Sequence, residues 1–294
     1  MQRPEARTLP DGRLHLSHGP IDLIISATGG EADCRRAFAA ATARFDTVLT
    51  ELVGELPALR RPDASVTGTV ARRMVAAVTP HRSSAFITPM AAVAGSVADE
   101  ILAAMTSAAP LRKAIVNNGG DIALMLAPGE TTTARIAHGS GATLGSLTLS
   151  AGDGIGGIAT SGRHGRSLSL GIADSVTVLA RTAAAADAAA TLIANAVDCG
   201  PHPAITRVPA KTLDPDSDLG ERLVVTACAH LPPAEVETAL TEGTRVASRM
   251  LEASLINAAA LFLAGEARTV GAPFTVLASP PAPAASRPAV RSHP

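Results

Sequence analysis

The feature that most constrains the fold is the run from Gly154 to Asp198, in which an alanine-rich segment after Arg181-Thr182 has the spacing of a helix. Asp187, Thr191 and Asn195 recur every four residues along it, and Asp198 follows three residues later. These polar side chains form one stripe on an otherwise apolar cylinder. The stripe is either a solvated helix face or a ligand-binding edge, and its apolar neighbours favour the second interpretation.

The core has to form almost without aromatic rings, because only 2% of the 294 residues are aromatic while 47% are hydrophobic. We therefore expect a core of Ala, Val, Leu and Ile. The lack of rings argues against single-stranded nucleic-acid binding, which stacks bases on aromatic side chains. The formal net charge of −1 provides no global field for a polyanion or an acidic membrane. The sequence thus predicts neither a nucleic-acid nor a membrane partner.

Three cysteines, Cys34, Cys199 and Cys228, are an odd number without CxxC spacing. That usage favours a reducing compartment over a disulfide framework, and we expect three small buried residues. The first sixteen residues contain no apolar stretch of signal-peptide length, and no uninterrupted apolar run reaches about 18 residues. We therefore expect a cytoplasmic protein.

Hydrophobic periodicity and turn residues predict most of the elements. We expect a hairpin over 13–26, a helix over 31–55 and a solvated loop at His81 and Arg82. Thr88-Pro89 is a good helix start, because Thr caps free backbone N–H groups and Pro suits the first position. Later segments are predicted as strands at 134–138, 143–150, 167–170, 175–180 and 222–228, an irregular connection at 201–209, a capped acidic turn at 214–220, and one or two helices over 232–263 with a break at 242–243.

Two loops combine turn chemistry with possible ligand chemistry. Residues 113–127 contain two apolar runs joined by Asn-Asn-Gly-Gly-Asp, which predicts a hairpin, while the glycines also let a backbone approach an anion beside Asp121. Thr160-Ser161-Gly162 precedes Arg163 and His164, which adds hydroxyl groups and local positive charge. The predicted helix start near residue 183 attracts phosphate, and Asp187 and Thr191 offer oxygen ligands to Mg²⁺. Together these features suit a pyrophosphate.

Other catalytic motifs are weaker. His164 is either a general base or, more commonly for a Gly/Arg loop, a surface residue. No Gly-x-Ser-x-Gly surrounds Ser161, so covalent catalysis is not expected. The cysteines and histidines lack zinc spacing. Residues 152–157 resemble the glycine pattern of a dinucleotide-binding motif, but strand-like sequence follows them where that motif requires a helix.

Four ordered motifs resemble the ApbE superfamily of FAD-binding proteins, and most closely an uncharacterised cytoplasmic ApbE-related branch. The resemblance covers roughly residues 13–265. The motifs are Asn118-Gly119-Gly120-Asp121, Ala159-Thr160-Ser161-Gly162, the SVTV run at 175–178 and the ADAAAT run at 186–191, with TPMAAVAG at 88–95 and NAVD at 195–198 also shared with that branch.

The resemblance implies an α+β fold of two intimately packed lobes with antiparallel-rich sheets, in one domain over 1–270 that is followed by a Pro/Ala-rich disordered tail at 271–294. Better-known members transfer FMN from FAD to a protein threonine or hydrolyse FAD. By position, Asp187 and Thr191 match magnesium ligands of the family. Positions near the flavin nucleotide are matched by Asn118, Gly119, Gly120, Asp121, Thr160, Ser161 and Gly162.

The chain departs from the transferases at several points. Their Ser-His-x-x-Asp-Pro segment is cut down to residues 169–174 and lacks the histidine, and their helix-start lysine is absent. We also expect none of the secretion or lipid-anchor signals that are common among the transferases. The remaining catalytic candidates are Asp121, Asp174 and His164. We expect a Mg²⁺-dependent protein that binds FAD and either cleaves or transfers its FMN part. The alternative is a non-catalytic flavin-binding accessory protein, with a protein partner in sulfur or homocysteine metabolism; a homodimer is also open.

Overall fold

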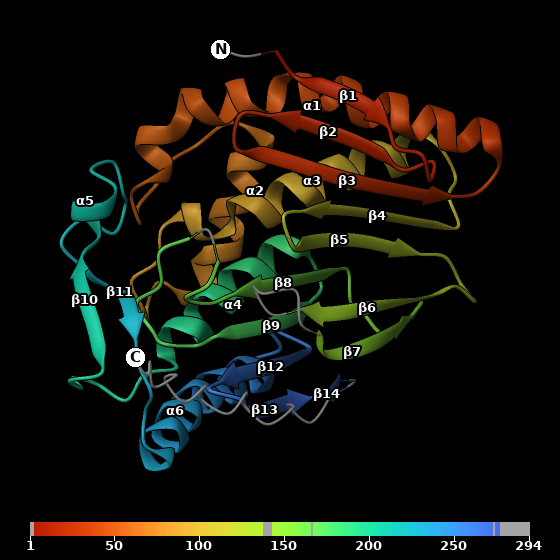
Figure 1. The fold of residues 1–294 in the computed structure, drawn as a ribbon. Helices are drawn as coiled ribbons and strands as arrows, with labels where there is room; N and C mark the ends of the chain where they lie inside the picture. The colour runs from red at the N-terminus through yellow and green to blue at the C-terminus, as the bar shows by residue number, and fades with distance from the viewer. Residues whose placement is uncertain (1–2, 138–142, 166, 273, 277–294) are drawn as a thin grey trace, which may run out of the picture.

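The structure is a computed structural model that describes residues 3–137, 143–165, 167–272 and 274–276. Its main element is a nine-stranded, wholly antiparallel sheet with the strand order β1-β2-β3-β4-β5-β8-β9-β12-β13. Helices cover one face of this sheet (Figure 1). The expected α+β architecture with antiparallel sheets is therefore confirmed.

The first half of the chain supplies five strands and three α-helices. In chain order they are β1 (Glu5–Thr8), β2 (Leu14–His18), β3 (Ile21–Thr28), α1 (Glu31–Leu59), α2 (Thr69–Val78), the 3-10 helices η1 (Thr79–His81) and η2 (Pro89–Ala92), α3 (Val93–Ala108), β4 (Lys113–Asn118) and β5 (Asp121–Leu126). As predicted, the Thr88 hydroxyl accepts a hydrogen bond from the Met90 N–H at the start of η2.

The second half repeats a similar succession. Its elements are β6 (Thr131–Ala137), β7 (Thr143–Ser150), β8 (Gly157–Ser161), β9 (Ser175–Ala180), α4 (Ala183–Ala196), β10 (Ile205–Pro209), α5 (Ala210–Leu213), β11 (Leu223–Cys228), α6 (Pro233–Glu252), β12 (Ala258–Leu263), β13 (Glu266–Gly271) and β14 (Phe274–Val276). In each half, two strands, two long helices and two strands follow one another: β2-β3-α1-α3-β4-β5 and β8-β9-α4-α6-β12-β13. We refer to these two successions as the first and the second unit.

The two units meet at a narrow seam in the sheet. Strands β5 and β8 share only two residue pairs, Ile122 with Ile158 and Ala123 with Gly157. On the helical face, α3 of the first unit packs against α4 of the second. The units are therefore joined mainly through helix packing, and any site at the seam draws residues from both.

The core is aliphatic, as expected from the composition. Each unit has its own cluster under its helices, and Phe45 is the only aromatic side chain among the largest fully buried ones. A third cluster lies on the other face of the sheet, where Leu147 and Leu149 of β7 pack toward Ile158 and Leu179. Cys34, Cys199 and Cys228 are free thiols and only partly buried, so the expectation of fully buried cysteines is wrong.

Several local predictions are wrong for tertiary reasons. Within the segment 232–263, residues 233–252 form one unbroken helix, α6, and residues 258–263 form the strand β12. Gly243 does not break that helix; a Cβ there would overlap the Val197 side chain and lie 2.8 Å from Leu261 Cδ2, so the glycine permits close packing. Residues 167–170 form no strand, while the irregular connection at 201–209 contains β10.

Two further segments also differ from expectation. His81 is 4% exposed at the end of η1 and not in a solvated loop, and burial lowers the pKa of its imidazole. Residues 274–276 of the predicted tail form β14, which pairs with β7. The rest of that tail, 277–294, and residues 138–142 of the predicted strand-and-turn region lie outside the described residues.

One helical run, Pro89–Ala108, is long and apolar enough to cross a membrane by length and composition alone, with a mean hydropathy of 1.2. It consists of η2 and α3, which pack against α1, α4 and the sheet in this structure. Helices buried in a protein core have the same length and hydropathy, and this run is the central helix of the first unit.

Candidate functional site

Helices α3 and α4 begin side by side, and each start is capped by a carboxylate of the other helix. The Gly95 N–H donates to Asp187 Oδ2 at 3.0 Å, while the N–H groups of Ala183 and Ala184 donate to Asp99 at 3.0 and 2.9 Å. The first N–H groups of a helix lack intrahelical acceptors and carry partial positive charge. The reciprocal caps therefore satisfy both starts and fix Asp187 at the contact between the two units.

Gly95 makes this contact possible. A Cβ at this position would overlap the Ala183 carbonyl group and lie 2.7 Å from the Ala184 nitrogen. Only a residue without a side chain allows the two helix starts to approach so closely. The glycine of the TPMAAVAG motif is thus explained by helix packing.

A pocket of about 320 Å³ opens beside these helix starts. Asp187 and Thr191 line it from α4, and Asp121 lines it from the first position of β5. Three of the residues predicted for ligand or metal binding therefore share one cavity. The remaining lining residues are Arg60, Met90, Ala91, Val93, Ala94, Ser167, Leu168, Asp214, Asp216, Ser217, Asp218 and Leu219.

Asp121 also bridges the seam between the two units. Its Oδ1 accepts from the Thr160 N–H at 3.3 Å, just beyond the last paired residues of β5 and β8. The Thr160 hydroxyl is 2.9 Å from the hydroxyl of Thr177 on β9. Thr160, Ser161 and Gly162 therefore lie at the end of β8 next to the pocket, although they are not among the residues that line it.

The Asn-Asn-Gly-Gly-Asp segment is the predicted hairpin turn. Gly119 and Gly120 have φ angles of 63° and 114°, values that favour glycine, and the Gly120 N–H donates to Asn117 Oδ1. The buried Asn118 side chain donates to the Ala94 carbonyl at 3.0 Å. The turn therefore positions Asp121 and supports the α3 start, and Asn118, Gly119 and Gly120 do not line the pocket.

The polar stripe of α4 has a different role at each position. Asp187 caps α3 and Thr191 lines the pocket, whereas Asn195 Oδ1 accepts from the Leu170 N–H at 2.9 Å. Asp198, beyond the helix, pairs with Arg207 of β10 at 2.6 Å. The prediction that the stripe is not a solvated face is confirmed, but only its first half faces a ligand-sized space.

Asp174 holds the loop at 163–174 in place through ion pairs and a backbone hydrogen bond. Asp174 Oδ1 accepts from Arg163 Nη2 at 2.6 Å and lies 3.3 Å from His164 Nε2, while its Oδ2 accepts from the Ala264 N–H at 2.7 Å. Neither Asp174 nor His164 lines the pocket, so the geometry does not bring these two candidates together with Asp121. Asp174 ties both ends of the loop to the β12–β13 turn.

Electrostatics in the pocket disfavour an additional negative charge. Burial raises the pKa of the Asp187 carboxyl well above its ordinary value, and the negative charges of Asp121 and Asp99 raise it further. Backbone hydrogen bonds from Gly95 and Ala94 lower this pKa, but by less. Burial likewise raises the pKa of Asp99. A bound cation would offset both the desolvation and the repulsion between carboxylates.

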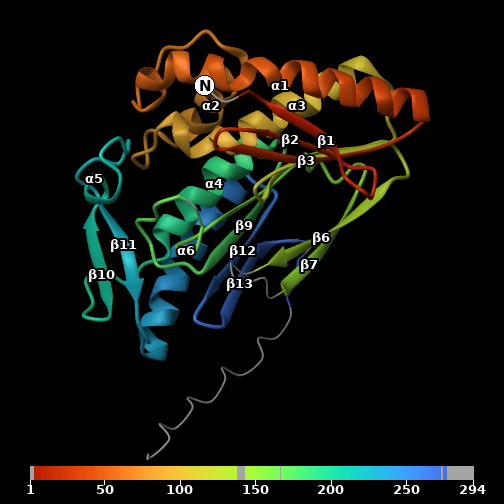
Figure 2. The same ribbon diagram turned by 45° about the horizontal axis from the view of Figure 1, so that its top comes forward.

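Sequence reasoning missed an acidic arm that reaches the pocket. The arm, residues 205–228, consists of β10, α5, an acidic tip at 214–219 and β11, and stands at the edge of the molecule (Figures 1 and 2). Asp218 accepts from the Thr88 hydroxyl, and the Arg222 guanidinium lies 3.2 Å over the Phe86 ring. Alternating aspartates at 214, 216 and 218 were the only local signal, and an isolated acidic turn gives no indication of what it faces.

The pocket suits a hard cation by its donor chemistry. It combines five aspartates and the Thr191 hydroxyl with one arginine, and Mg²⁺ prefers such oxygen ligands. In the described part of the chain, no group of three or more His, Cys, Asp or Glu side chains is already arranged around a common metal position. The residues could therefore supply part of a coordination shell, with the ligand and water supplying the rest.

Known proteins resemble the chain over different lengths. A family model described as "AbpE bacteria" matches residues 6–269. A UPF0280 protein of Methanothrix thermoacetophila is 42% identical over 121 residues, 40% of this chain and 49% of the relative. A UPF0280 protein of Methanosarcina acetivorans is 38% identical over 132 residues, 45% of this chain and 50% of the relative. The chain spans about half the length of these curated relatives.

Solved structures are more distant in sequence. The ApbE protein from Thermotoga maritima is 13% identical with a TM-score of 0.40, over 66% of this chain and 87% of that chain. The apo form of the flavinyl transferase ApbE from Pseudomonas stutzeri is 11% identical with a TM-score of 0.37, over 94% and 96% of the two chains.

Proposed function

The chain belongs to the family described as "AbpE bacteria", and we propose on that premise that it binds FAD together with Mg²⁺ in the pocket at the seam. The observation that carries the proposal is the meeting of Asp187, Thr191 and Asp121 in one cavity. These residues come from two motifs, one in each unit, that resemble the flavin-handling family. Asp121 is far from Asp187 and Thr191 in sequence, and the fold brings the three side chains together.

The charge of the pocket supports a metal requirement. FAD contains a pyrophosphate, and five aspartates facing a single arginine would repel it. Mg²⁺ held by Asp187 and Thr191 would supply the positive charge that the protein side chains lack, and would stabilise negative charge on phosphate oxygens. Asp121 would then position the ligand across the seam through its contact with Thr160.

The proposal is tested with flavin-free protein by calorimetric titration of FAD in Mg²⁺ and in EDTA. We expect binding that depends on Mg²⁺ and is weakened roughly tenfold or more, at least about 1.4 kcal/mol, by Asp187→Asn. Asp46→Asn is the matched control, because Asp46 is an exposed residue of α1 that does not line the pocket. Equal FAD affinity in Mg²⁺ and EDTA, or in wild type and Asp187→Asn, would contradict the proposal.

Whether FAD is also cleaved depends on Asp121. It is the one catalytic candidate that lines the pocket, since Asp174 and His164 are bound to each other outside the lining. The cleavage hypothesis predicts FMN and AMP when FAD, Mg²⁺ and protein are incubated and separated by chromatography, with loss of product in Asp121→Asn. Unchanged product formation in that variant would exclude Asp121 as a catalytic residue.

The second candidate function is a non-catalytic flavin carrier. It is favoured by the engagement of Asp174 in closing the loop, where it pairs with Arg163 and accepts from Ala264. A carrier would bind FAD with Mg²⁺ and release it intact. Tight, Asp187-dependent binding without any FMN or AMP would distinguish the carrier from the enzyme.

A further inference from the structure

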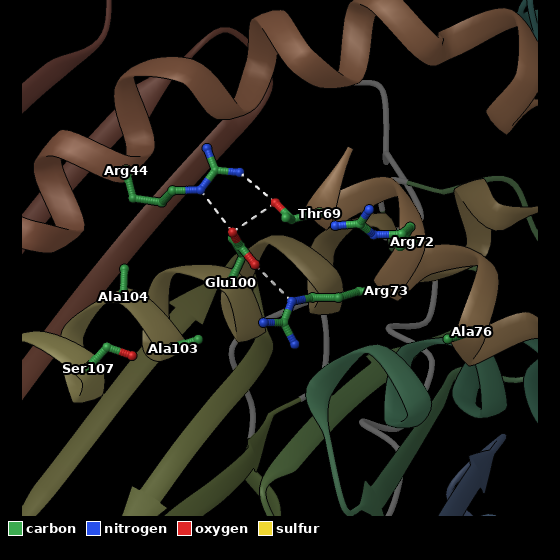
Figure 3. Close-up of a pocket in the computed structure, with 9 residues that line it drawn as sticks. All are labelled: Arg44, Thr69, Arg72, Arg73, Ala76, Glu100, Ala103, Ala104 and Ser107. Carbon is green, nitrogen blue, oxygen red and sulfur yellow. Dashed lines mark hydrogen bonds and ion pairs between the residues drawn. The ribbon is translucent and has the colours of Figure 1, made fainter. Parts of the chain in front are cut away.

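A second cavity, of about 630 Å³, lies between α2 and α3 and shares no lining residue with the pocket at the seam. Figure 3 shows Arg44, Thr69 and Arg73 around the carboxylate of Glu100, with Arg72 to one side of them. The lining residues are Arg44, Thr69, Arg72, Arg73, Ala76, Glu100, Ala103, Ala104 and Ser107. Nothing in the proposed flavin chemistry uses this cavity.

Glu100 is bound from two neighbouring helices. Its Oε1 accepts from Arg44 Nε of α1 at 2.8 Å and from the Thr69 hydroxyl of α2 at 2.9 Å, and its Oε2 accepts from Arg73 Nε at 2.9 Å. Burial alone would raise the pKa of Glu100, but the hydrogen bonds from Arg44, Arg73 and Thr69 hold it below its ordinary value. Glu100 is therefore ionised at neutral pH and fixes the orientation of both guanidinium groups.

The three arginines differ in how much of their hydrogen-bonding capacity the protein uses. Arg44 is fully engaged, because its Nη atoms also donate to Thr47, Glu51 and Thr69. Arg73 is bonded through Nε alone, and within the described residues its two Nη groups have no hydrogen-bond partner. The side chain of Arg72, beside it on α2, forms no hydrogen bond or ion pair in the part of the chain that the structure describes, although its charge helps to lower the pKa of Glu55. Two adjacent guanidinium groups thus line the cavity with free donors.

We propose that this cavity binds a small organic anion through a phosphate or carboxylate group held by Arg72 and Arg73. Guanidinium groups pair with both oxyanions through two parallel N–H···O bonds, and Glu100 has already ordered one of the forks. Thr69, Arg72, Ala76 and Ser107 are exposed, so the cavity is open to solvent and a small ligand can reach the arginines directly. Ala76, Ala103 and Ala104 provide an apolar wall for the carbon part of the ligand, and the Ser107 hydroxyl provides one further polar contact.

The same lining argues against a second flavin site. None of the lining residues is aromatic, so an isoalloxazine or adenine ring would find no stacking surface there. The charge is also opposite to that of the pocket at the seam, where five aspartates face one arginine. A ligand of the second cavity therefore needs no metal ion to bind.

The test is calorimetric titration of the full chain, in EDTA and at constant ionic strength, with inorganic phosphate, glycerol 3-phosphate and citrate as separate probes. The first two probes report a phosphate preference and the third a carboxylate preference. We expect saturable binding of at least one probe to wild type and at least tenfold weaker binding to Arg72→Gln. Arg72 is exposed and its substitution removes no hydrogen bond in the described structure, so this variant should fold normally.

Two controls assign the binding to the cavity. Arg35→Gln removes an exposed guanidinium of α1 outside the cavity and should bind the probe as wild type does. Asp187→Asn changes the pocket at the seam and the acceptor of the Gly95 N–H, but no residue that lines the second cavity, and should also bind the probe as wild type does. Arg73→Lys keeps the charge but loses the ordered fork, and should bind more weakly than wild type. Absence of saturable binding by all three probes, equal affinity in Arg72→Gln, or loss of binding in Asp187→Asn would overturn the proposal. None of these results depends on whether FAD binds.

Discussion

The acidic pocket at the seam and the basic cavity beside α2 border different parts of the same helix, α3, and carry opposite charge. The start of α3 borders the acidic pocket, whereas its Glu100, Ala103, Ala104 and Ser107 border the basic cavity. In the first, carboxylates crowd together and the pKa of Asp187 rises; in the second, a carboxylate is surrounded by guanidinium groups and the pKa of Glu100 falls. A chain with a net charge of −1 thus places side chains of opposite charge around two separate cavities.

The largest effect is expected from Gly95→Ala, at the contact between α3 and α4 beside the acidic pocket. The new Cβ would overlap the Ala183 carbonyl group and force α3 and α4 apart. We expect a loss of about 3 kcal/mol or more in the free energy of unfolding, measured by urea denaturation.

Gly54→Ala is the matched control in α1, because a Cβ there meets nothing within 4 Å. It should be neutral or stabilise the protein by up to about 1 kcal/mol, as alanine does in an open helical position. Similar denaturation curves for the two variants would show that the helix starts do not need the glycine.

Glu100→Gln should produce the next largest effect, at the basic cavity. The variant leaves Arg44 and Arg73 without the carboxylate that both guanidinium groups share. Arg73 is 39% exposed, so water compensates part of the loss, and we expect destabilisation of about 2 kcal/mol in urea denaturation. Glu31→Gln removes an exposed partner of Arg35 and should change little. A Glu100→Gln variant as stable as wild type would mean that the arginines do not depend on this carboxylate.

The two cavities should respond to pH in opposite directions. Because the pKa of Asp187 is raised on folding, its contribution to stability falls as pH rises from the ordinary value toward the raised one. Because the pKa of Glu100 is lowered, its contribution is present above the ordinary value and is lost as pH falls. Denaturation of wild type, Asp187→Asn and Glu100→Gln between about pH 3 and pH 8 should give stability differences that change with opposite slopes. Parallel slopes would contradict the charge comparison.

The smallest effect is expected from Asp216→Asn at the exposed tip of the acidic arm. The side chain lines the acidic pocket but accepts no hydrogen bond from any helix or strand in the described residues, so stability should remain within about 0.5 kcal/mol of wild type. The Mg²⁺-dependent affinity for FAD should fall about two- to fivefold, since an exposed carboxylate contributes up to about 1 kcal/mol. Unchanged affinity would show that the arm does not contribute to the site.

Local sequence signals were sufficient where short-range chemistry decides the structure. The Gly119-Gly120 turn, the Thr88 cap and the helix at 183–196 follow from turn, cap and periodicity rules, and the structure confirms them. The spacing of Asp187 and Thr191 also correctly indicated that both side chains share one face.

Long-range packing decided the elements that sequence reasoning missed. Gly243 lies inside a helix because the Val197 and Leu261 side chains pack so closely there that no Cβ would fit. The local sequence does not indicate that contact. Asp99 was not singled out, although it caps α4 from 84 residues away in sequence. The acidic tip at 214–219 acquired its role only when the arm brought it to the pocket. At the candidate site the sequence could therefore identify separate motifs, but not the arm or the reciprocal caps that join them.

The narrow seam between β5 and β8 has a consequence for how the protein would respond to its ligand. Two residue pairs, the Leu124 N–H to Gly156 carbonyl hydrogen bond and the Asp121–Thr160 contact join the sheets of the two units there. A ligand bound across the seam would act as a cross-link between units that the backbone joins only weakly. Amide hydrogens of β5 and β8 should accordingly exchange faster than those of the long β3–β4 ladder in the free protein, and should slow selectively when the site is filled.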